Sequence, residues 1–205
     1  ALATLMSLKT ALLDLPLGGG KGGVIVNPKE LTIVELEELS RGYVQKLSEH
    51  IGPTKDIPAP DVNTNSQIMD WMVDEYSKIT GDTTKASFTG KSIENGGSLG
   101  RDSATGQGGL YVLETVIESL DRKAEDFTYA VQGFGNVGAF FAELIQDRFP
   151  NWKLVCVSDS SGAIVSEEGF DAHALAKYKS DGGKFADFDS EGITHIDAAE
   201  IISID

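Results

Sequence analysis

Residues 128–149 read TYAVQGFGNVGAFFAELIQDRF, and this stretch decides the fold of the chain. The mostly apolar residues 128–132 predict a buried strand, and residues 133–138 match the pattern G-x-G-x-x-G. A helix to about Phe149 is predicted next, and residues 153–159 (KLVCVSD) predict a second strand. A strand, a glycine turn, a helix and a second strand in this order indicate a parallel pair in an α/β fold.

The glycines of residues 133–138 have separate physical roles in binding a dinucleotide. Gly133 permits the tight turn, Gly135 lets a pyrophosphate approach the backbone, and Gly138 lets the helix pack closely. The following helix presents free N–H groups and its positive dipole end to the phosphates. The sequence therefore predicts a site for NAD or NADP, with an ordinary glycine-rich turn as the alternative.

Asp159 ends the second predicted strand, 21 residues after Gly138. An acidic residue at this spacing accepts hydrogen bonds from the adenosine ribose hydroxyls, which favours NAD. A downstream lysine could instead neutralise a 2′-phosphate, although a solvated helix face is the more ordinary interpretation of Lys177, Lys179 and Lys184. The sequence leaves the choice between NAD and NADP open.

A second glycine-rich segment, residues 15–23 (LPLGGGKGG), surrounds Lys21 with five glycines. Glycines remove side-chain bulk, so a substrate can approach the lysine closely. A phosphate-binding Walker loop does not fit, because Gly22 stands where that motif needs Ser or Thr. Residues 24–26 (VIV) predict a short strand, which favours a buried loop.

Composition excludes several classes of function. Acidic residues outnumber basic ones 32 to 17, giving a net charge of −15, which argues against nucleic acids and anionic membrane surfaces as partners. No apolar run reaches the roughly 20 residues of a membrane helix. Cys156 is the single cysteine and the three histidines are scattered, so we expect no metal site, no disulfide and a reducing, cytoplasmic location. The acidity fits an ordinary cytosolic protein or adaptation to high salt.

The remaining pattern predicts helices over residues 2–13 (buried), from the capping pair Thr32 and Glu35 to about His50, from Thr64 and Gln67 to about Thr80, and over 103–120. The expected fold class is α/β in two parts. Residues 1–97 form an incomplete α/β substrate domain, and residues 98–205 form the first half of a Rossmann domain. The sequence begins inside an apolar helical pattern without a start Met and stops just after Ile201, Ile202 and Ile204, which suggests a fragment of a longer polypeptide.

Four segments carry a resemblance to a known family: LPLGGGKGGVIVNP (15–28), DIPAPDV (56–62), GGSLGRDSATGQG (96–108) and QGFGNVG (132–138). In this order they resemble the glutamate/leucine/phenylalanine/valine dehydrogenases, and among these the glutamate dehydrogenases most. The resemblance implies reversible oxidative deamination of L-glutamate to 2-oxoglutarate and ammonia, with NAD or NADP, in a homohexamer. The alternatives are leucine, phenylalanine or valine dehydrogenase, or a dinucleotide-binding subunit without catalysis.

The resemblance also assigns substrate and catalytic roles. Lys21 matches the lysine that polarises the substrate carbonyl and activates a water, and Asp61 matches the aspartate that moves protons to and from the imino nitrogen. Lys9 matches the lysine that holds the substrate α-carboxylate. Ala59 matches a backbone contact to the substrate, and Arg101 matches a residue near it.

On the cofactor side, Thr105 matches the threonine that fixes the nicotinamide carboxamide, and Asn136 and Val137 join the glycine turn. Met6 departs from relatives that use a glutamine on the α-carboxylate. The residues that read the substrate side chain in the family fall outside this sequence. The resemblance therefore does not decide which amino acid is bound.

Overall fold

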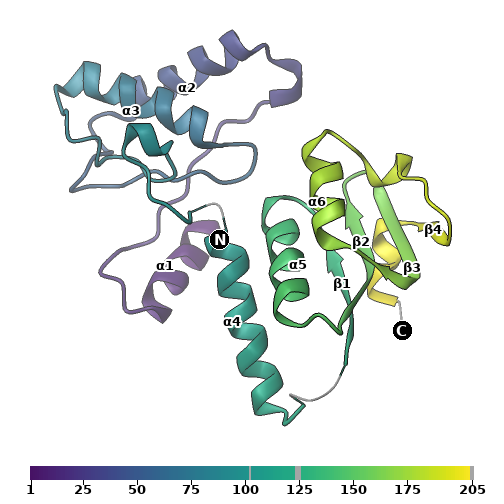
Figure 1. The fold of residues 1–205 in the computed structure, drawn as a ribbon. Coiled ribbons are helices and arrows are strands. Elements are labelled where there is room, and N and C mark those ends of the chain that lie inside the picture. The colour runs from purple at the N-terminus through teal and green to yellow at the C-terminus, as the bar shows by residue number, and fades with distance from the viewer. Residues whose placement is uncertain (102, 123–125, 204–205) are drawn as a thin grey trace. The chain divides into compact units, whose positions relative to one another are not determined.

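A computed structural model describes residues 1–101, 103–122 and 126–203 of the chain. It has the predicted mixed α/β character (Figure 1). The chain divides into two compact units, Ala1–Leu99 and Gly100–Asp205, called unit 1 and unit 2 below. In the described part of the chain, no helix is long and apolar enough to cross a membrane.

Unit 1 contains α1 (Leu2–Leu12), α2 (Ile33–Leu47) and α3 (Ser66–Thr80), with short 3-10 helices at Pro28–Glu30 and Ile93–Asn95. The predicted capping box of α2 is confirmed. The Thr32 hydroxyl accepts from the Glu35 amide at 3.3 Å, and the Glu35 carboxylate accepts from the Thr32 amide at 2.8 Å. These bonds satisfy amides that the first helical turn leaves free.

The start of α3 differs from the prediction by one residue. Its cap is Asn65, whose side chain accepts from the Ile68 amide at 3.1 Å. Thr64 was the wrong cap, because its hydroxyl is engaged in a turn with Asp61.

The core of unit 1 lies between α2 and α3. Apolar side chains recur on one face of α3 at helical spacing and pack against α2 and the loop after α3. The buried set is Val44, Ile51, Ile68, Met69, Met72, Val73, Tyr76 and Phe88. This packing fixes the loop that joins the two helices, which carries Asp61.

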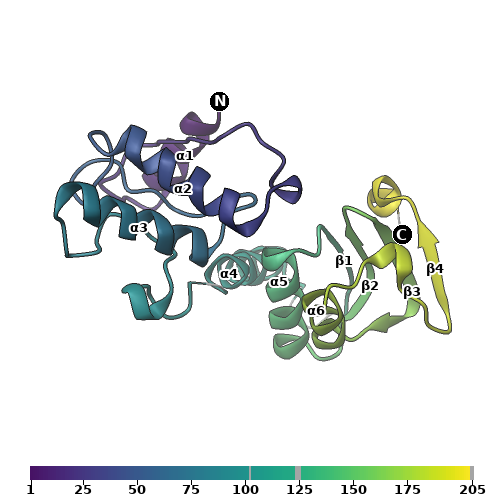
Figure 2. The same cartoon turned by 90° about the horizontal axis from the view of Figure 1, so that it is seen from above.

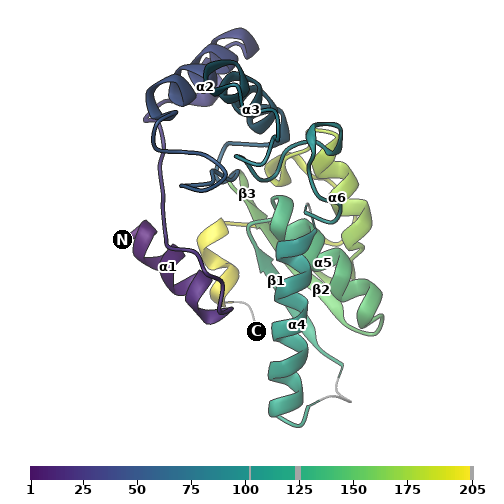
Figure 3. The same ribbon diagram turned by 90° about the vertical axis from the view of Figure 1, so that its left-hand side faces the viewer.

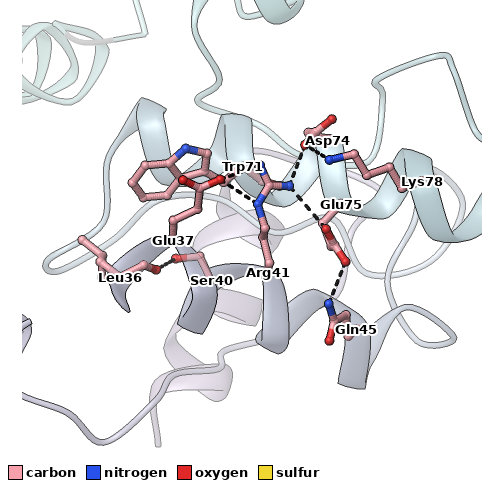
Figure 4. Close-up of polar contacts among 9 residues, drawn as sticks. All are labelled: Leu36, Glu37, Ser40, Arg41, Gln45, Trp71, Asp74, Glu75 and Lys78. Atoms are coloured by element: carbon pink, nitrogen blue, oxygen red, sulfur yellow. Dashed lines mark hydrogen bonds and ion pairs between the residues drawn. The ribbon is translucent and has the colours of Figure 1, made fainter. Parts of the chain in front are cut away.

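A polar network at Arg41 joins the same two helices (Figure 4). The Arg41 guanidinium binds Glu37 on its own helix at 2.7 Å, and Asp74 and Glu75 on α3 at 2.6 and 3.3 Å. The side chain is only 21% exposed, so solvent screens these pairs less than it screens a surface pair.

We expect Arg41→Met to lower the free energy of unfolding by about 1–2 kcal/mol, between the values for exposed and buried ion pairs. Lys78→Ala is the control, because the exposed Lys78 pairs with no acidic residue other than Asp74 in the described part of the chain. This substitution should cost under about 1 kcal/mol. Urea unfolding of the full-length protein measures both. Equal effects of the two substitutions would contradict the assigned role.

Two expectations for the start of unit 1 are wrong. Residues 24–26 form no strand, and Ile25 is fully exposed. A strand needs a neighbour that pairs its backbone groups, and no described strand of unit 1 lies beside this segment. Helix α1 forms as predicted but is not buried within unit 1, since Thr10 is its one buried residue.

Unit 2 contains a four-stranded sheet in the order β1 (Thr128–Gln132), β2 (Lys153–Asp159), β3 (Gly162–Phe170) and β4 (Ile193–Ile196), as Figure 2 shows. Its helices are α4 (Ala104–Ser119), α5 (Asn136–Arg148) and α6 (Ala172–Ser180), with 3-10 helices at Phe185–Asp187 and Ala198–Ser203. Strands β1 and β2 have the predicted bounds, and their parallel pairing is confirmed.

The third and fourth strands were not predicted. Strand β3 turns back on β2 in a hairpin that pairs Asp159 with Gly162, and β4 pairs with β3, both antiparallel. Gly162 has φ +158°, at the limit of the region that favours glycine. A parallel crossover continues the usual Rossmann pattern, so the hairpin alters the expected topology after β2.

Both faces of this sheet bury apolar side chains. On one face, Leu154, Val157 and Ile164 pack with residues of α5 and α6. On the other face, Cys156 packs with Ala163 and Ile201. Cys156 is fully buried, and this burial raises the pKa of its thiol to about 11.

His173 on α6 faces two carboxylates of α5. Its Nε2 lies 2.9 Å from Asp147, and its Nδ1 lies 3.3 Å from Glu143. The hydrogen bond with Asp147, aided by the charges of Glu143 and Asp171, raises the pKa of His173. A raised native pKa stabilises the fold below the ordinary histidine pKa, and this stabilisation is lost as pH rises through the native value.

We therefore expect His173→Gln to lower the urea midpoint of the full-length protein more at pH 6 than at pH 8.5. His195→Gln is the control, because the described partner of His195 is the Phe188 carbonyl at 2.9 Å rather than a carboxylate. A loss from His173→Gln that is the same at both pH values would disprove the charge-dependent contribution.

Candidate functional site

The segment around Lys21, residues 15–23, is held against α1 and is called the lysine loop. The buried Thr10 hydroxyl donates to the Leu17 carbonyl at 2.9 Å. A Cβ on Gly19 would lie 2.2 Å from the Ala3 carbonyl oxygen, so only glycine permits this approach of loop and helix. The helix that carries Lys9 is therefore fixed to the loop that carries Lys21.

A second close contact fixes the loop beyond the lysine. A Cβ on Gly22 would lie 2.5 Å from the Tyr43 hydroxyl of α2. Gly18 and Gly23 have nothing within 4 Å of the position of a Cβ, so the loop also has an open side. The absence of side chains thus serves both packing and access to Lys21.

Lys21 forms an ion pair with Asp61, which the sequence placed in the same site. The hydrogen bond from Lys21 and a second from the Val62 amide at 2.9 Å lower the pKa of Asp61. The pair is not desolvated, since the Lys21 and Asp61 side chains are 35% and 54% exposed. The buried lysine loop predicted from the sequence is therefore wrong for the described residues.

The backbone around Asp61 is fixed by a tight turn. The Asp61 amide donates to the Thr64 hydroxyl at 2.6 Å, and that hydroxyl donates back to the Asp61 carbonyl at 2.8 Å. Sequence reasoning missed this positioning role of Thr64, although a hydroxyl three residues after an aspartate is typical of such turns.

Lys9 and Ala59 lie in the same unit as this pair. The positive charge of Lys9 also lowers the pKa of Asp61, so Lys9 is within electrostatic range of the carboxylate. The residues on either side of Ala59 are held by the loop after α3. The Pro58 carbonyl accepts from the Thr89 amide at 2.9 Å, and a Cβ on Gly90 would lie 2.5 Å from the Pro60 ring. The four residues that the sequence assigned to unit 1 are exposed, and the charges of Lys21 and Lys9 both act on Asp61.

In unit 2, residues 133–138 form the dinucleotide turn between β1 and α5. Gly133 has φ +87°, which L side chains rarely adopt. A Cβ on Gly138 would lie 2.2 Å from the Gly133 carbonyl oxygen, whereas one on Gly135 would meet nothing within 4 Å. The three glycines therefore have the geometry expected for a turn, an open approach and a close contact.

The start of α5 can accept a phosphate. Its N-cap is Gly135, and no side chain of the described residues caps its first turn. Asn136 and Val137 of that turn are exposed. Free amides at an exposed helix start are the usual binding site for pyrophosphate, so this chain fits NAD or NADP there.

The dinucleotide turn is tied to the end of β2. The Gly133 and Phe134 amides both donate to the Ser158 carbonyl, at 3.0 and 2.6 Å, and the Ser158 hydroxyl accepts from Gly133 at 3.2 Å. These bonds place the next residue, Asp159, beside the turn. Sequence reasoning did not single out Ser158, because its role depends on strand pairing.

Thr105 is exposed on the first turn of α4, which lies along α5 (Figure 3). A Cβ on Gly106 would lie 3.0 Å from the Phe141 amide, and one on Gly109 would lie 3.2 Å from the Phe141 ring. These two glycines were not predicted as site residues, yet they allow α4 to pack closely on α5. They thereby place Thr105 next to the helix of the dinucleotide turn.

Arg101 is exposed at the start of unit 2, before α4. No ion pair of Arg101 is found among the described residues, and its assigned role stays a prediction. Among the same residues, no group of three or more His, Cys, Asp or Glu side chains is placed to hold a metal ion.

A parallel strand pair with this glycine turn defines a dinucleotide-binding protein of the Rossmann type. Comparison with known families is more specific. The model of the Glu/Leu/Phe/Val dehydrogenase dimerisation domain matches residues 1–78, and that of glutamate/leucine/phenylalanine/valine dehydrogenase matches residues 96–205. The chain belongs to the Glu/Leu/Phe/Val dehydrogenase family.

The individual relatives reported next are named glutamate dehydrogenases. An NADP-specific glutamate dehydrogenase of Synechocystis is 49% identical over 87% of this chain and 41% of its own length. A glutamate dehydrogenase of Thermotoga maritima is 46% identical over 98% of this chain and 48% of its own. The crystal structure of a hetero-hexameric glutamate dehydrogenase from Thermus thermophilus, in a leucine-bound form, matches with 40% identity and a TM-score of 0.83, over 90% of this chain and 44% of that one. The chain thus spans about half the length of the curated relatives it matches.

Proposed function

We propose that the protein containing this chain interconverts L-glutamate with 2-oxoglutarate and ammonia, using NAD or NADP. The observation that carries the proposal is the Lys21–Asp61 ion pair beside a glycine-lined loop, in a chain that also has a dinucleotide turn. Two relatives are named glutamate dehydrogenases, and they are 46–49% identical to this chain.

In this proposal, the three charged site residues of unit 1 have separate tasks. Lys9 binds the substrate α-carboxylate as a point charge. The Lys21 ammonium stabilises the oxygen of the carbinolamine and orients the attacking water. Asp61, whose pKa is lowered by the hydrogen bond from Lys21, is ionised and accepts a proton from the substrate nitrogen, which it returns in the reverse direction.

On the cofactor side, the bound dinucleotide supplies a hydride acceptor for the substrate Cα. The amides at the start of α5 bind its pyrophosphate, and Thr105 holds its carboxamide. Arg101 and the Ala59 backbone orient the substrate.

An amino-acid panel tests the proposal. The full-length protein is assayed with glutamate, leucine, phenylalanine and valine, each with NAD and with NADP. We expect kcat/KM for glutamate to exceed that for the other three. A preference for leucine, phenylalanine or valine would refute the substrate, and dinucleotide binding without turnover of any of the four would refute catalysis.

We also infer that the full-length protein is a homohexamer in the cytoplasm. The hetero-hexamer named for the Thermus thermophilus relative supports the subunit number, and light scattering would measure it.

The net charge of −15 supports adaptation to high salt, because salt screens self-repulsion among carboxylates. Unchanged stability from low to multimolar salt would contradict that adaptation.

A further inference from the structure

The carboxylate of Asp159 is already fully bonded within the protein. One oxygen accepts from the Ser161 amide at 2.7 Å and from the Ser161 hydroxyl. The other accepts from the Phe185 amide at 3.3 Å and from the Lys179 ammonium. A carboxylate has about four lone-pair positions, so these donors leave none for the ribose hydroxyls.

The surroundings of this carboxylate are those of a structural anchor. The Asp159 side chain is 11% exposed, and its bonds join the β2–β3 turn to the segment after α6. The Ser161 hydroxyl extends the connection by accepting from the Ala186 amide at 3.1 Å. The pKa of Asp159 is lowered to about 2, since the hydrogen bonds from Lys179, Ser161 and Phe185 outweigh the effect of burial.

Unlike the Asp159 carboxylate, the Lys179 ammonium is not fully bonded within the protein. Its ammonium donates to Asp159 and to the Gly183 carbonyl at 2.9 Å, and these bonds hold it at the carboxyl end of β2. An ammonium has three donors, so these two bonds leave one for a ligand. The Phe185 ring centroid lies 5.0 Å from the ammonium nitrogen, and the Lys179 side chain is 22% exposed. Lys177 lies on the same helix, but it is largely exposed and pairs with Asp181.

The charge at this place also favours a phosphate. An unpaired aspartate would repel a 2′-phosphate, whereas the Lys179–Asp159 pair is neutral and offers one N–H. The pair lies next to the dinucleotide turn, because Ser158 accepts from Gly133. The adenosine ribose follows the pyrophosphate at this strand end in dinucleotide-binding folds.

We propose that Lys179, and not Asp159, recognises the 2′ position of the adenosine ribose, and that the site accepts the 2′-phosphorylated dinucleotide. Asp159 acts as the positioning residue for the lysine. The proposal rests on the proposed function, and it prefers Lys179 to Lys177, which is paired with Asp181.

Direct binding of NADPH and NADH to the full-length protein tests this assignment, with nucleotide fluorescence as the readout. We expect Lys179→Met to raise the Kd for NADPH about tenfold or more, the effect of losing a charged hydrogen bond, and to change the Kd for NADH less than about threefold. Lys179→Arg should keep most of the NADPH affinity. Lys177→Met is the matched control and should change neither Kd.

Asp159→Asn separates the two roles. If Asp159 positions Lys179, the variant weakens NADPH binding more than NADH binding. Selective loss of NADH binding would overturn the proposal, as would a Lys179→Met variant that weakens both equally or neither. Thermal unfolding of each variant shows whether it is folded. An unsubstituted protein that binds neither dinucleotide would refute the proposed function as well, and this outcome is distinct because it appears without any substitution.

Discussion

Replacing Lys21 with alanine in the full-length protein is expected to lower kcat for glutamate deamination about 10³-fold, at the upper end of the range for removing one group that stabilises an oxyanion. The reason is that Lys21 is the cation bound to Asp61 and is flanked by glycines on both sides. In the proposed mechanism, its loss removes the charge that stabilises the carbinolamine oxygen, and it removes the hydrogen bond that lowers the pKa of Asp61.

The binding of NADPH should be unaffected by this change, because the dinucleotide turn belongs to unit 2 and Lys21 to unit 1. Steady-state assays give kcat, and nucleotide fluorescence gives the Kd. The matched control is Lys29→Ala, an exposed lysine after the same loop, which should leave both values unchanged. Retention of kcat in Lys21→Ala would remove Lys21 from the mechanism.

The second large effect is expected from Gly138→Ala in the dinucleotide turn. The new Cβ would lie 2.2 Å from the Gly133 carbonyl oxygen and 3.2 Å from a Val131 methyl group, so the backbone must move. We expect an overpacking cost of about 2–3 kcal/mol. If the turn must return to its original geometry to bind the pyrophosphate, binding loses the same free energy. A loss of this size raises the Kd about 100-fold.

Gly135→Ala is the matched variant, because its Cβ meets no protein atom within 4 Å and its φ of −91° suits any residue. Its unfolding free energy should change by less than about 0.5 kcal/mol. Its dinucleotide binding should still weaken, since the methyl group occupies the space through which the pyrophosphate approaches. If Gly138→Ala changed neither the free energy of unfolding nor the Kd, the close approach of residue 138 to the Gly133 carbonyl would not determine the geometry of the turn.

Local signals were sufficient for much of the fold. The capping box of α2 and the bounds of β1 and β2 depend on residues within a few positions of each other. The glycine pattern likewise encodes a turn whose φ value and close contacts are local. Such features are determined by backbone sterics and by hydrogen bonds between near neighbours.

Features that depend on distant neighbours could not be predicted. The apolar residues 24–26 have β propensity, but a strand also requires a partner. The antiparallel return of β3 follows from a two-residue turn that the sequence pattern does not distinguish from other loops. Tyr43 packs against Gly22 across 21 positions, and no local pattern signals that contact.

The candidate site likewise has features that the sequence could predict and features that it could not. Resemblance named Lys21 and Asp61, and the structure places their charged groups in contact, although their roles stay predictions. The fingerprint also named Asp159, but the pattern contains no information about Ser161, Phe185 and Lys179, which occupy its oxygens. A motif specifies which group stands at the strand end, and not how many donors that group already has.

The burial of Cys156 has a practical consequence for labelling. Its thiol is inaccessible and stays protonated at neutral pH, so it should not react with maleimide probes in the native protein. A cysteine introduced at an exposed position of unit 1 would then be the one reactive thiol of this chain. Dyes or spin labels could be attached there without first replacing Cys156.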